Sequence, residues 1–374
     1  MRDRRIVQII ANFVLPPVLT TTASLADFSA LLAGEARIGL DTEFLRERTY
    51  RAQLCLVQLS GNDAAACVDP LVLPDLTPLA ALLAAPGVTK VMHASRQDLE
   101  VLLPVVGLTR PVFDTQIAAG LTGLPAQIGY AELVRRKLGK DLPKSHTRTD
   151  WSRRPLSPEQ IEYALDDVRY LLPLAQLLQE ELARLGRLDW LGEELAALGD
   201  ARALSVEPDE AWLRIRGLRD LDPARARLAR ALGAWRERNA VEHDRPRGWI
   251  LEDAVLREIV MQVPRTLDAL AQLPDMPPGL LKRRGAELLA CVEAAQLSDP
   301  PPALPARARP DPAKTALVKK LGAVSQAVAA ELNLVPEVLA TRRELEQLAD
   351  GRRDGAVLNG WRRAILGEQL LAAL

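Results

Sequence analysis

Five short apolar segments in the first third of the chain constrain the fold more than any other feature of the sequence. They are Arg37–Leu40, Leu54–Leu59, Ala65–Val68, Thr89–His93 and Val112–Asp114. Their length is typical of buried strands, whereas Leu76–Leu83 and Gln97–Leu103 have helical spacing. The turn sequence Ser60–Asp63 joins the second and third segments as a hairpin. These patterns predict an α/β domain with a mixed sheet flanked by helices.

From about Glu207 the sequence changes to amphipathic helical segments punctuated by prolines, which predicts an all-α second half. A Pro- and Ala-rich stretch near residue 300 is typical of a semi-rigid linker. The expected organisation is an N-terminal extension (1–17), an α/β domain (18–206), a helical domain (207–295), a linker (296–312) and a second, divergent helical domain (313–374).

Composition fits a water-soluble globular protein. The 374 residues are 48% hydrophobic and carry a formal net charge of −1. Three cysteines lack metal-ligand spacing, which favours a reducing compartment. Gln8, Asn12 and Pro16 interrupt the N-terminal apolar stretch, so we expect a loose leader or an early start codon rather than a secretory signal. No apolar run reaches the ~20 residues that a membrane span needs. A cytoplasmic location is the expectation.

A helix is predicted to begin after Ser157. Ser157 is a suitable N-cap, proline follows at the first helical position, and Gln160 completes a capping box. Apolar residues then recur with helical spacing as far as Leu172. Pro173 is expected to kink or break this helix.

Four carboxylates and one tyrosine carry the candidate chemistry. Asp41 and Glu43 follow the first apolar segment, and residues two apart on a strand share one face. Asp98 lies where a strand should end and a helix begin, which is where sites form in open α/β sheets. Tyr163 and Asp167 are one turn apart on the helix that follows Ser157.

Clustered carboxylates repel one another unless a cation lies between them, and oxygen-only ligands suit Mg²⁺ or Mn²⁺. Two-metal phosphodiester cleavage requires such a set, with open positions for phosphate and water. A phenol at the rim can align the attacking water, because tyrosine is too weak a base to deprotonate it at neutral pH. By spacing alone, Glu100, Asp114 and Asp69 compete with Asp98, and Asp166 competes with Asp167.

In this order, Asp41-Thr42-Glu43, Asp98 and Tyr163-x-x-x-Asp167 resemble the three motifs of the DEDDy exonuclease family. The neighbouring sequences resemble the ribonuclease D branch of that family over roughly residues 18–185. These sequences are Asp41–Phe44, Arg48–Tyr50, His93-Ala94, Phe113–Gln116 and Asp150-Trp151-x-x-Arg154-Pro155-Leu156. The helical remainder resembles HRDC domains, more clearly in 207–295 than in 313–374.

The resemblance implies a DnaQ-like (ribonuclease H-like) fold and a metal-dependent 3′→5′ exoribonuclease that releases nucleoside 5′-monophosphates. It implies that two divalent ions are held by four carboxylates and that Tyr163 positions the hydrolytic water. The implied metal ligands are Asp41, Glu43, Asp98 and Asp167. The family pattern also favours Asp98 and Asp167 over their competitors. RNA is the implied partner, with tRNA precursors undergoing 3′ maturation as the best-known substrate class.

Residues 135–154 contain eight Lys or Arg residues and two Asp residues, a local net charge of +6. Such a stretch beside an acidic site suits a phosphate-backbone substrate, although a solvated helix face is the commoner meaning. The candidate RNA contacts are Lys144, Arg148, Trp151, Arg153, Arg154, Lys282, Arg283 and Arg284. Trp151 fits base stacking or anchoring of its loop, and anchoring is slightly favoured. His93 is interpreted as structural.

Two alternatives remain at this stage. A DNA 3′→5′ exonuclease would use the same metal chemistry, although the chain has no polymerase or helicase portion. A non-catalytic RNA-binding protein would be expected to lack one of the carboxylates, and all four are present. The sequence shows no oligomerisation stripe, so a monomer is the expectation.

Overall fold

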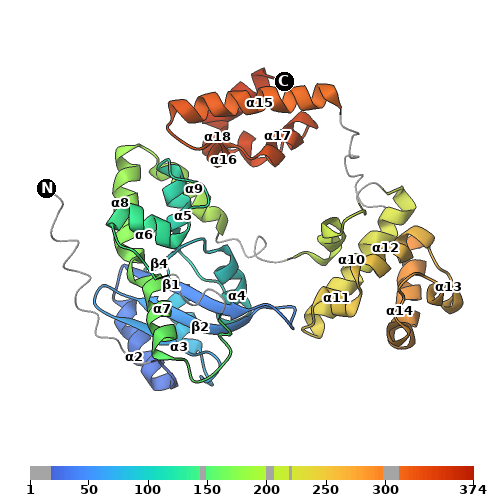
Figure 1. Cartoon of the computed structure of the whole chain (residues 1–374), viewed down its shortest axis with the longest axis horizontal. Helices are drawn as coiled ribbons and strands as arrows, with labels where there is room; N and C mark the ends of the chain where they lie inside the picture. Colours follow the sequence, from blue (N-terminus) through green and yellow to red (C-terminus); the bar gives the residue numbers. More distant parts are fainter. Residues whose placement is uncertain (1–17, 144–148, 199–205, 219–220, 298–310) are drawn as a thin grey trace. The chain divides into compact units, whose positions relative to one another are not determined.

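The computed structural model describes residues 18–143, 149–198, 206–218, 221–297 and 311–374 (Figure 1). These residues form two compact units. The first contains the described parts of Met1–Leu45, Leu54–Leu204 and Pro310–Leu374. The second contains Arg46–Gln53 and the described parts of Ser205–Arg309. The chain therefore leaves the first unit after residue 204 and returns to it near residue 310.

A five-stranded mixed sheet forms the centre of the first unit. Its strands are β1 (Arg37–Leu45), β2 (Gln53–Ser60), β3 (Ala65–Val68), β4 (Thr89–Met92) and β5 (Val112–Asp114). The order is β3-β2-β1-β4-β5, with β4 parallel to β1 and β5 and with β3 antiparallel to β2. The predicted α/β class with a mixed sheet is confirmed. Strand β1 is longer than the predicted Arg37–Leu40, so the acidic pair lies on the strand itself.

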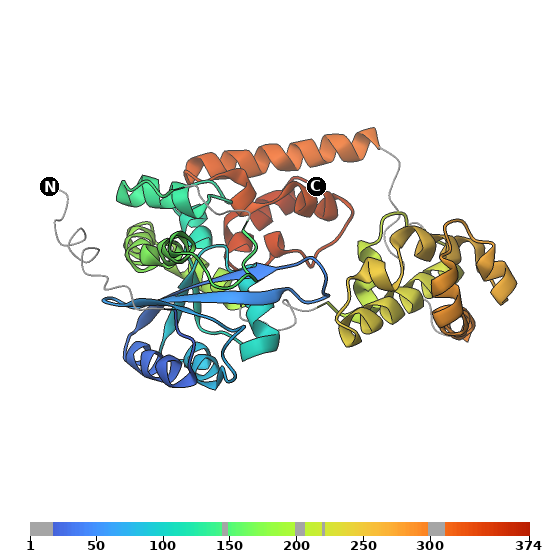
Figure 2. The same ribbon diagram turned by 60° about the horizontal axis from the view of Figure 1, so that its bottom comes forward.

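Helices cover both faces of this sheet. They are α2 (Thr22–Ala33), α3 (Thr77–Ala84), α4 (Arg96–Val106), α5 (Thr115–Leu121), α6 (Tyr130–Leu138), α7 (Pro158–Arg169), α8 (Leu171–Arg184) and α9 (Leu188–Leu198). In both ribbon views, α2 and α3 lie on one face and α7 and α8 on the other (Figures 1 and 2). The face beneath α7 is the one that carries the candidate site.

The start and end of α7 follow from local sequence. Ser157 and Gln160 form the predicted capping box. The helix ends at Arg169, and α8 begins at Leu171 with Pro173 in its first turn, so the predicted break occurs just before the proline.

At the junction between α7 and α8, the end of α7 approaches β1 closely. A Cβ atom on Gly39 would come within 2.3 Å of Ser60 Oγ and 3.1 Å of the Val168 carbonyl oxygen. Glycine at position 39 thus lets the end of α7 approach the strand that carries Asp41 and Glu43.

The C-terminal helices share a hydrophobic core with the sheet-containing part of the first unit. They are α15 (Pro312–Glu331), α16 (Pro336–Leu339), α17 (Arg342–Ala349), the short η2 (Ala356–Leu358), α18 (Gly360–Arg362), η3 (Arg363–Gly367) and α19 (Glu368–Ala372). The ring of Trp361 stacks on that of Trp190 in α9, with centroids 4.4 Å apart. Its indole nitrogen donates to Glu194 Oε1 at 2.8 Å. These helices therefore belong to the same compact unit as the sheet.

Apart from Arg46–Gln53, the described part of the second unit is helical, as expected from the sequence. Its elements are η1 (Pro208–Arg214), α10 (Pro223–Glu242), α11 (Arg247–Ile250), α12 (Asp253–Gln262), α13 (Leu267–Ala271) and α14 (Pro278–Leu297). Its core includes Trp212, Leu232, Ile259 and Leu288. Within the described ranges of the chain, no helix combines the length and the apolar character needed to cross a membrane.

Candidate active site

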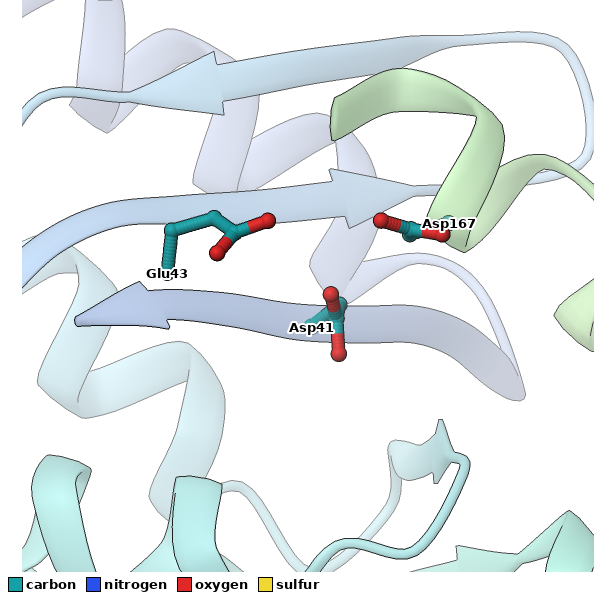
Figure 3. Close-up of side chains that lie close together, drawn as sticks. All are labelled: Asp41, Glu43 and Asp167. Carbon is teal, nitrogen blue, oxygen red and sulfur yellow. The ribbon is translucent and has the colours of Figure 1, made fainter. Parts of the chain in front are cut away.

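Three carboxylates converge between β1 and the last turn of α7. One oxygen from each of Asp41, Glu43 and Asp167 can be chosen so that all three lie within 4.8 Å of one another. Figure 3 shows Asp41 and Glu43 projecting from the strand toward Asp167 on the helix. The alternation of side chains along β1 puts Asp41 and Glu43 on one face. The capped helix α7, packed closely against Gly39, brings Asp167 to the same face.

The electrostatics of the cluster are those expected of a cation-binding site. Burial raises the pKa of Asp41 well above its usual range, and the charges of Asp98, Asp167 and Glu43 add to this effect. Burial and the charge of Asp167 raise the pKa of Glu43 to about 8. Burial, with Asp166 nearby, raises the pKa of Asp167 to about 7. Among the described residues, none of these three carboxylates forms an ion pair with Lys or Arg.

Asp98 lies beside this cluster, but its carboxylate is oriented differently. Asp98 is in the first turn of α4 and is 8% exposed. Its Oδ1 accepts a hydrogen bond from Thr42 Oγ1 at 2.5 Å, and it is not one of the three carboxylates that converge within 4.8 Å. Its charge nevertheless raises the pKa values of Asp41 and Glu43, so it acts on the same site. Burial raises the pKa of Asp98 itself to about 6.

Thr42 is a residue of the candidate site that the sequence analysis did not single out. It is 5% exposed and lies between the two acids, and its hydroxyl fixes the position of Asp98. A hydroxyl residue in the middle of an acidic pair on a strand is the signal that could have drawn attention to it.

The acids that compete with Asp98 and Asp167 in the sequence have other partners. Asp69 pairs with Arg154, and Glu100 pairs with Arg96. Asp114 accepts hydrogen bonds from the backbone N–H groups of Ser95, Gln116 and Ile117, the last two as the N-cap of α5. Asp166 pairs with Arg169. The structure therefore brings Asp167, and not Asp166, to the acidic pair on β1.

Tyr163 lies one turn before Asp167, at the edge of the cluster. Burial and the charge of Asp167 raise the pKa of its hydroxyl, so the phenol stays protonated at neutral pH. Its ring stacks on that of Trp151, with centroids 6.1 Å apart and the ring planes at 29°. Trp151 is 4% exposed and packs in a small core with Cys55, Leu56 and Leu165. This burial favours the anchoring interpretation of Trp151 over base stacking.

The other candidate RNA contacts lie in varied settings. Lys144 and Arg148 fall outside the described residues. Arg153 is 84% exposed and pairs with Asp150. Arg154 is largely engaged within the protein, since it pairs with Asp69 and donates to the carbonyl oxygens of Cys55 and Trp151.

In the second unit, Lys282 and Arg283 are exposed on α14. Arg284, which follows them, pairs with Glu287. His93 is structural, as predicted, because its two ring nitrogens contact Thr115 Oγ1 at 2.9 Å and the Ile128 carbonyl oxygen at 3.0 Å.

The donor set fits a divalent metal. The converging atoms are hard carboxylate oxygens. The raised pKa values of these carboxyl groups reflect burial and mutual repulsion, which a divalent ion would offset. Asp41, Glu43 and Asp167 are the residues that would hold it, with Asp98 adjacent. A carboxylate cluster of this kind is typical of metal-dependent phosphoryl chemistry.

Comparisons with known proteins identify the family of this chain. Residues 16–183 match the 3′-5′ exonuclease family, and residues 225–292 match the HRDC domain. The chain is 41% identical to a ribonuclease D from Gluconacetobacter diazotrophicus over 97% of this chain and 93% of that one. It is 40% identical to a ribonuclease D from Xanthomonas oryzae pv. oryzae, over 96% of this chain and 99% of that one.

Among solved structures, the chain resembles Escherichia coli RNase D, which is described as an exoribonuclease involved in structured RNA processing. The TM-score is 0.86 at 34% sequence identity, and the match covers 96% of this chain and 98% of the other. The predicted exonuclease fold followed by HRDC-type helices is thereby confirmed. The chain belongs to the ribonuclease D family of exoribonucleases.

Proposed function

We propose that this protein hydrolyses RNA from the 3′ end and releases nucleoside 5′-monophosphates, using two divalent ions, Mg²⁺ or Mn²⁺. The observation that carries the proposal is the convergence of Asp41, Glu43 and Asp167 within 4.8 Å, with Asp98 beside them. We assign metal ligation to these four carboxylates. Family membership and the E. coli relative's role in structured RNA processing support RNA as the substrate.

Each protein group has a distinct task in this proposal. Divalent ions held by these carboxylates would lower the pKa of the attacking water and stabilise the charge on the leaving oxygen. Asp41 and Glu43 hold one side of the site from a rigid strand, and Asp167 holds the other from α7. Thr42 keeps the Asp98 carboxylate in one orientation. Tyr163 stays protonated and orients the attacking water by a hydrogen bond, because its raised pKa makes it a poor general base.

We further propose that tRNA precursors with 3′ extensions are among the substrates. The +6 stretch at residues 135–154 would attract a phosphate backbone, and the helical parts would extend the binding surface. Arg153, Lys282 and Arg283 are the described candidates whose side chains are exposed for such contacts. The cytoplasmic location and the monomeric state expected from the sequence remain predictions.

The test is digestion of a 5′-labelled tRNA precursor carrying a 3′ extension, with Mg²⁺ and with EDTA. The Asp41→Asn protein and a DNA strand of matched sequence serve as controls. The expected result is a metal-dependent ladder that shortens from the 3′ end, on RNA only, and is absent with Asp41→Asn. Equal or faster shortening of DNA would move the function to DNA processing. Tight binding without shortening would leave an RNA-binding protein and would contradict the proposal.

A further inference from the structure

Strand β2 carries a buried glutamine whose side chain has no hydrogen-bond partner in the described part of the chain. Gln58 lies on β2 and is 0% exposed. Among the described residues, neither its side-chain oxygen nor its side-chain nitrogen has a hydrogen-bond partner. Most buried side-chain amides are paired, so an unpaired one in a native structure calls for an explanation such as a ligand or an ordered water. The position of Gln58 indicates which explanation applies.

The neighbours of Gln58 on β2 and β3 place it on the same face of the sheet as the candidate site. Ser60, two residues further along β2, donates to the Val168 carbonyl oxygen at 3.0 Å, so this face of β2 lies under the end of α7. Residues two apart on a strand share a face, and Gln58 therefore also lies beneath α7. Across the ladder Gln58 is directly opposite Cys67 of β3. Burial and the charge of Glu43 raise the pKa of the Cys67 thiol to about 12, which places that thiol within the electrostatic reach of the cluster.

The contact between β1 and β2 brings Gln58 next to Asp41. A Cβ atom on Gly39 would lie 2.3 Å from Ser60 Oγ, so Gly39 and Ser60 are neighbours on adjacent strands. In Figure 3 the neighbouring strand runs opposite to the strand that carries Asp41. Two residues further along β1 is Asp41, and two residues back along β2 is Gln58. Cross-strand neighbours on one face have Cβ atoms only about 5 Å apart, within reach of a long side chain.

We propose that Gln58 is a positioning residue of the metal site, whose side-chain amide hydrogen-bonds to a water or carboxylate oxygen of the Asp41–Glu43–Asp167 cluster when a divalent ion is bound. The inference rests on the proposed function, because it requires that the cluster binds metal. An amide suits the task, since it can donate to a carboxylate or water oxygen and accept from a water without adding charge to an already acidic site. Such outer partners hold metal ligands in place, and their loss typically weakens metal affinity 10- to 100-fold.

The test compares Gln58→Met with the wild-type protein in two measurements. Methionine has the same length and no polar amide, so it preserves packing. Mn²⁺ affinity, measured by titration calorimetry on the full chain, is expected to fall about tenfold or more. The melting temperature in EDTA is expected to be unchanged or higher, because the variant removes a buried amide that has no hydrogen-bond partner among the described residues. If Gln58 is purely structural, the variant should bind Mn²⁺ as tightly as wild type and should melt at a lower temperature.

A matched control is Thr109→Val. Thr109 is 3% exposed, its hydroxyl has no partner among the described residues, and it precedes β5 rather than lying on the strands of the cluster. Its replacement is expected to leave Mn²⁺ affinity unchanged. Gln58→Leu replaces Gln58→Met if the methionine variant does not fold.

The possible outcomes separate the two proposals. Mn²⁺ affinity within about twofold of wild type in the Gln58 variant, with the wild type binding normally, would overturn the role of Gln58 alone. A wild-type protein that binds no Mn²⁺ would overturn the metal site, and with it this inference.

Discussion

A buried acid of the first unit, Asp69, and a cluster of partly buried acids in the same unit are in opposite electrostatic states. Asp69, which is 2% exposed, accepts two hydrogen bonds from the guanidinium of Arg154, one of them at 2.8 Å. Asp41, Glu43 and Asp167 converge within 4.8 Å with no Lys or Arg partner among the described residues. A carboxylate paired in this way stabilises the fold, whereas a cluster of like charges destabilises it unless a cation binds. The presence or absence of a cationic partner therefore distinguishes an acid that stabilises the fold from a candidate metal ligand more clearly than burial does.

The largest expected effect follows from neutralising one carboxylate of the Asp41–Glu43–Asp167 cluster. Asp41→Asn or Asp167→Asn should reduce RNA hydrolysis by about a thousandfold or more, because a bound metal contributes several kcal/mol to the transition state. The fold should persist, since neither carboxylate forms an ion pair with a Lys or Arg in the described part of the chain. Single-turnover digestion and circular dichroism measure the two quantities. Near-wild-type turnover by either variant, in protein free of contaminating nuclease, would remove these residues from the site.

Breaking the ion pair between Arg154 and Asp69 should instead lower the stability of the fold. Arg154→Ala leaves Asp69 buried without its partner, and we expect the free energy of unfolding to fall by about 3 kcal/mol. Urea unfolding followed by tryptophan fluorescence measures the loss. The neighbouring Arg153→Ala is the control, because Arg153 is 84% exposed and its pair with Asp150 contributes under about 1 kcal/mol. Equal stability of Arg154→Ala and Arg153→Ala would show that the Asp69 pair is not structural.

A substitution at Tyr163 tests whether a residue at the edge of the cluster affects the rate of hydrolysis rather than the binding of RNA. Tyr163→Phe keeps the ring that stacks on Trp151 and removes only the hydroxyl. We expect kcat to fall about 10- to 100-fold with KM for RNA nearly unchanged, because an aligned water is lost while the substrate contacts remain. Steady-state kinetics on a 3′-extended RNA provides both values. A rise in KM with unchanged kcat would contradict the orienting role.

The sequence predicted the features of the fold and of the candidate site that depend on local patterns. Apolar runs located all five strands, and the capping box located the start of α7. The acidic pair on one strand face and the one-turn spacing of Tyr163 and Asp167 also follow from local periodicity. The convergence of Asp167 with the pair was accessible only through the resemblance to a known family, because it depends on the packing of α7 on Gly39.

Long-range packing accounts for what the sequence did not predict. The stacking of Trp190 on Trp361 joins residues 171 positions apart, so no local pattern could show that the C-terminal helices share a core with the sheet. The pairing of Arg154 with Asp69 is equally remote, and it turned a candidate RNA contact into a residue largely engaged within the protein. Gln58 did leave a local signal, since it is the one polar residue within the apolar run Leu54–Leu59.

The smallest expected effect concerns the dependence of protein stability on pH. It compares Glu43 of the cluster directly with Asp69 of the ion pair. Burial and Asp167 raise the pKa of Glu43 from 4.5 to about 8 in the folded protein. Below about pH 4.5 this carboxyl is protonated in both the folded and the unfolded state, and its favourable contribution is fully present. As the pH rises toward 8 the unfolded state ionises first, so that contribution is lost. Metal-free wild-type protein should therefore lose stability between about pH 4.5 and pH 8.

Glu43→Gln removes this dependence at one position. In EDTA at pH 8 the variant should be more stable than wild type by at least about 1 kcal/mol, and the difference should shrink as the pH approaches 5. Asp69→Asn should instead destabilise the protein at both pH values, because Arg154 loses its partner. Melting temperatures of the three proteins at pH 5 and pH 8 suffice. A loss of stability at pH 8 in both variants would mean that other groups of the protein stabilise the ionised Glu43 carboxylate, which would contradict the contrast between Glu43 and Asp69.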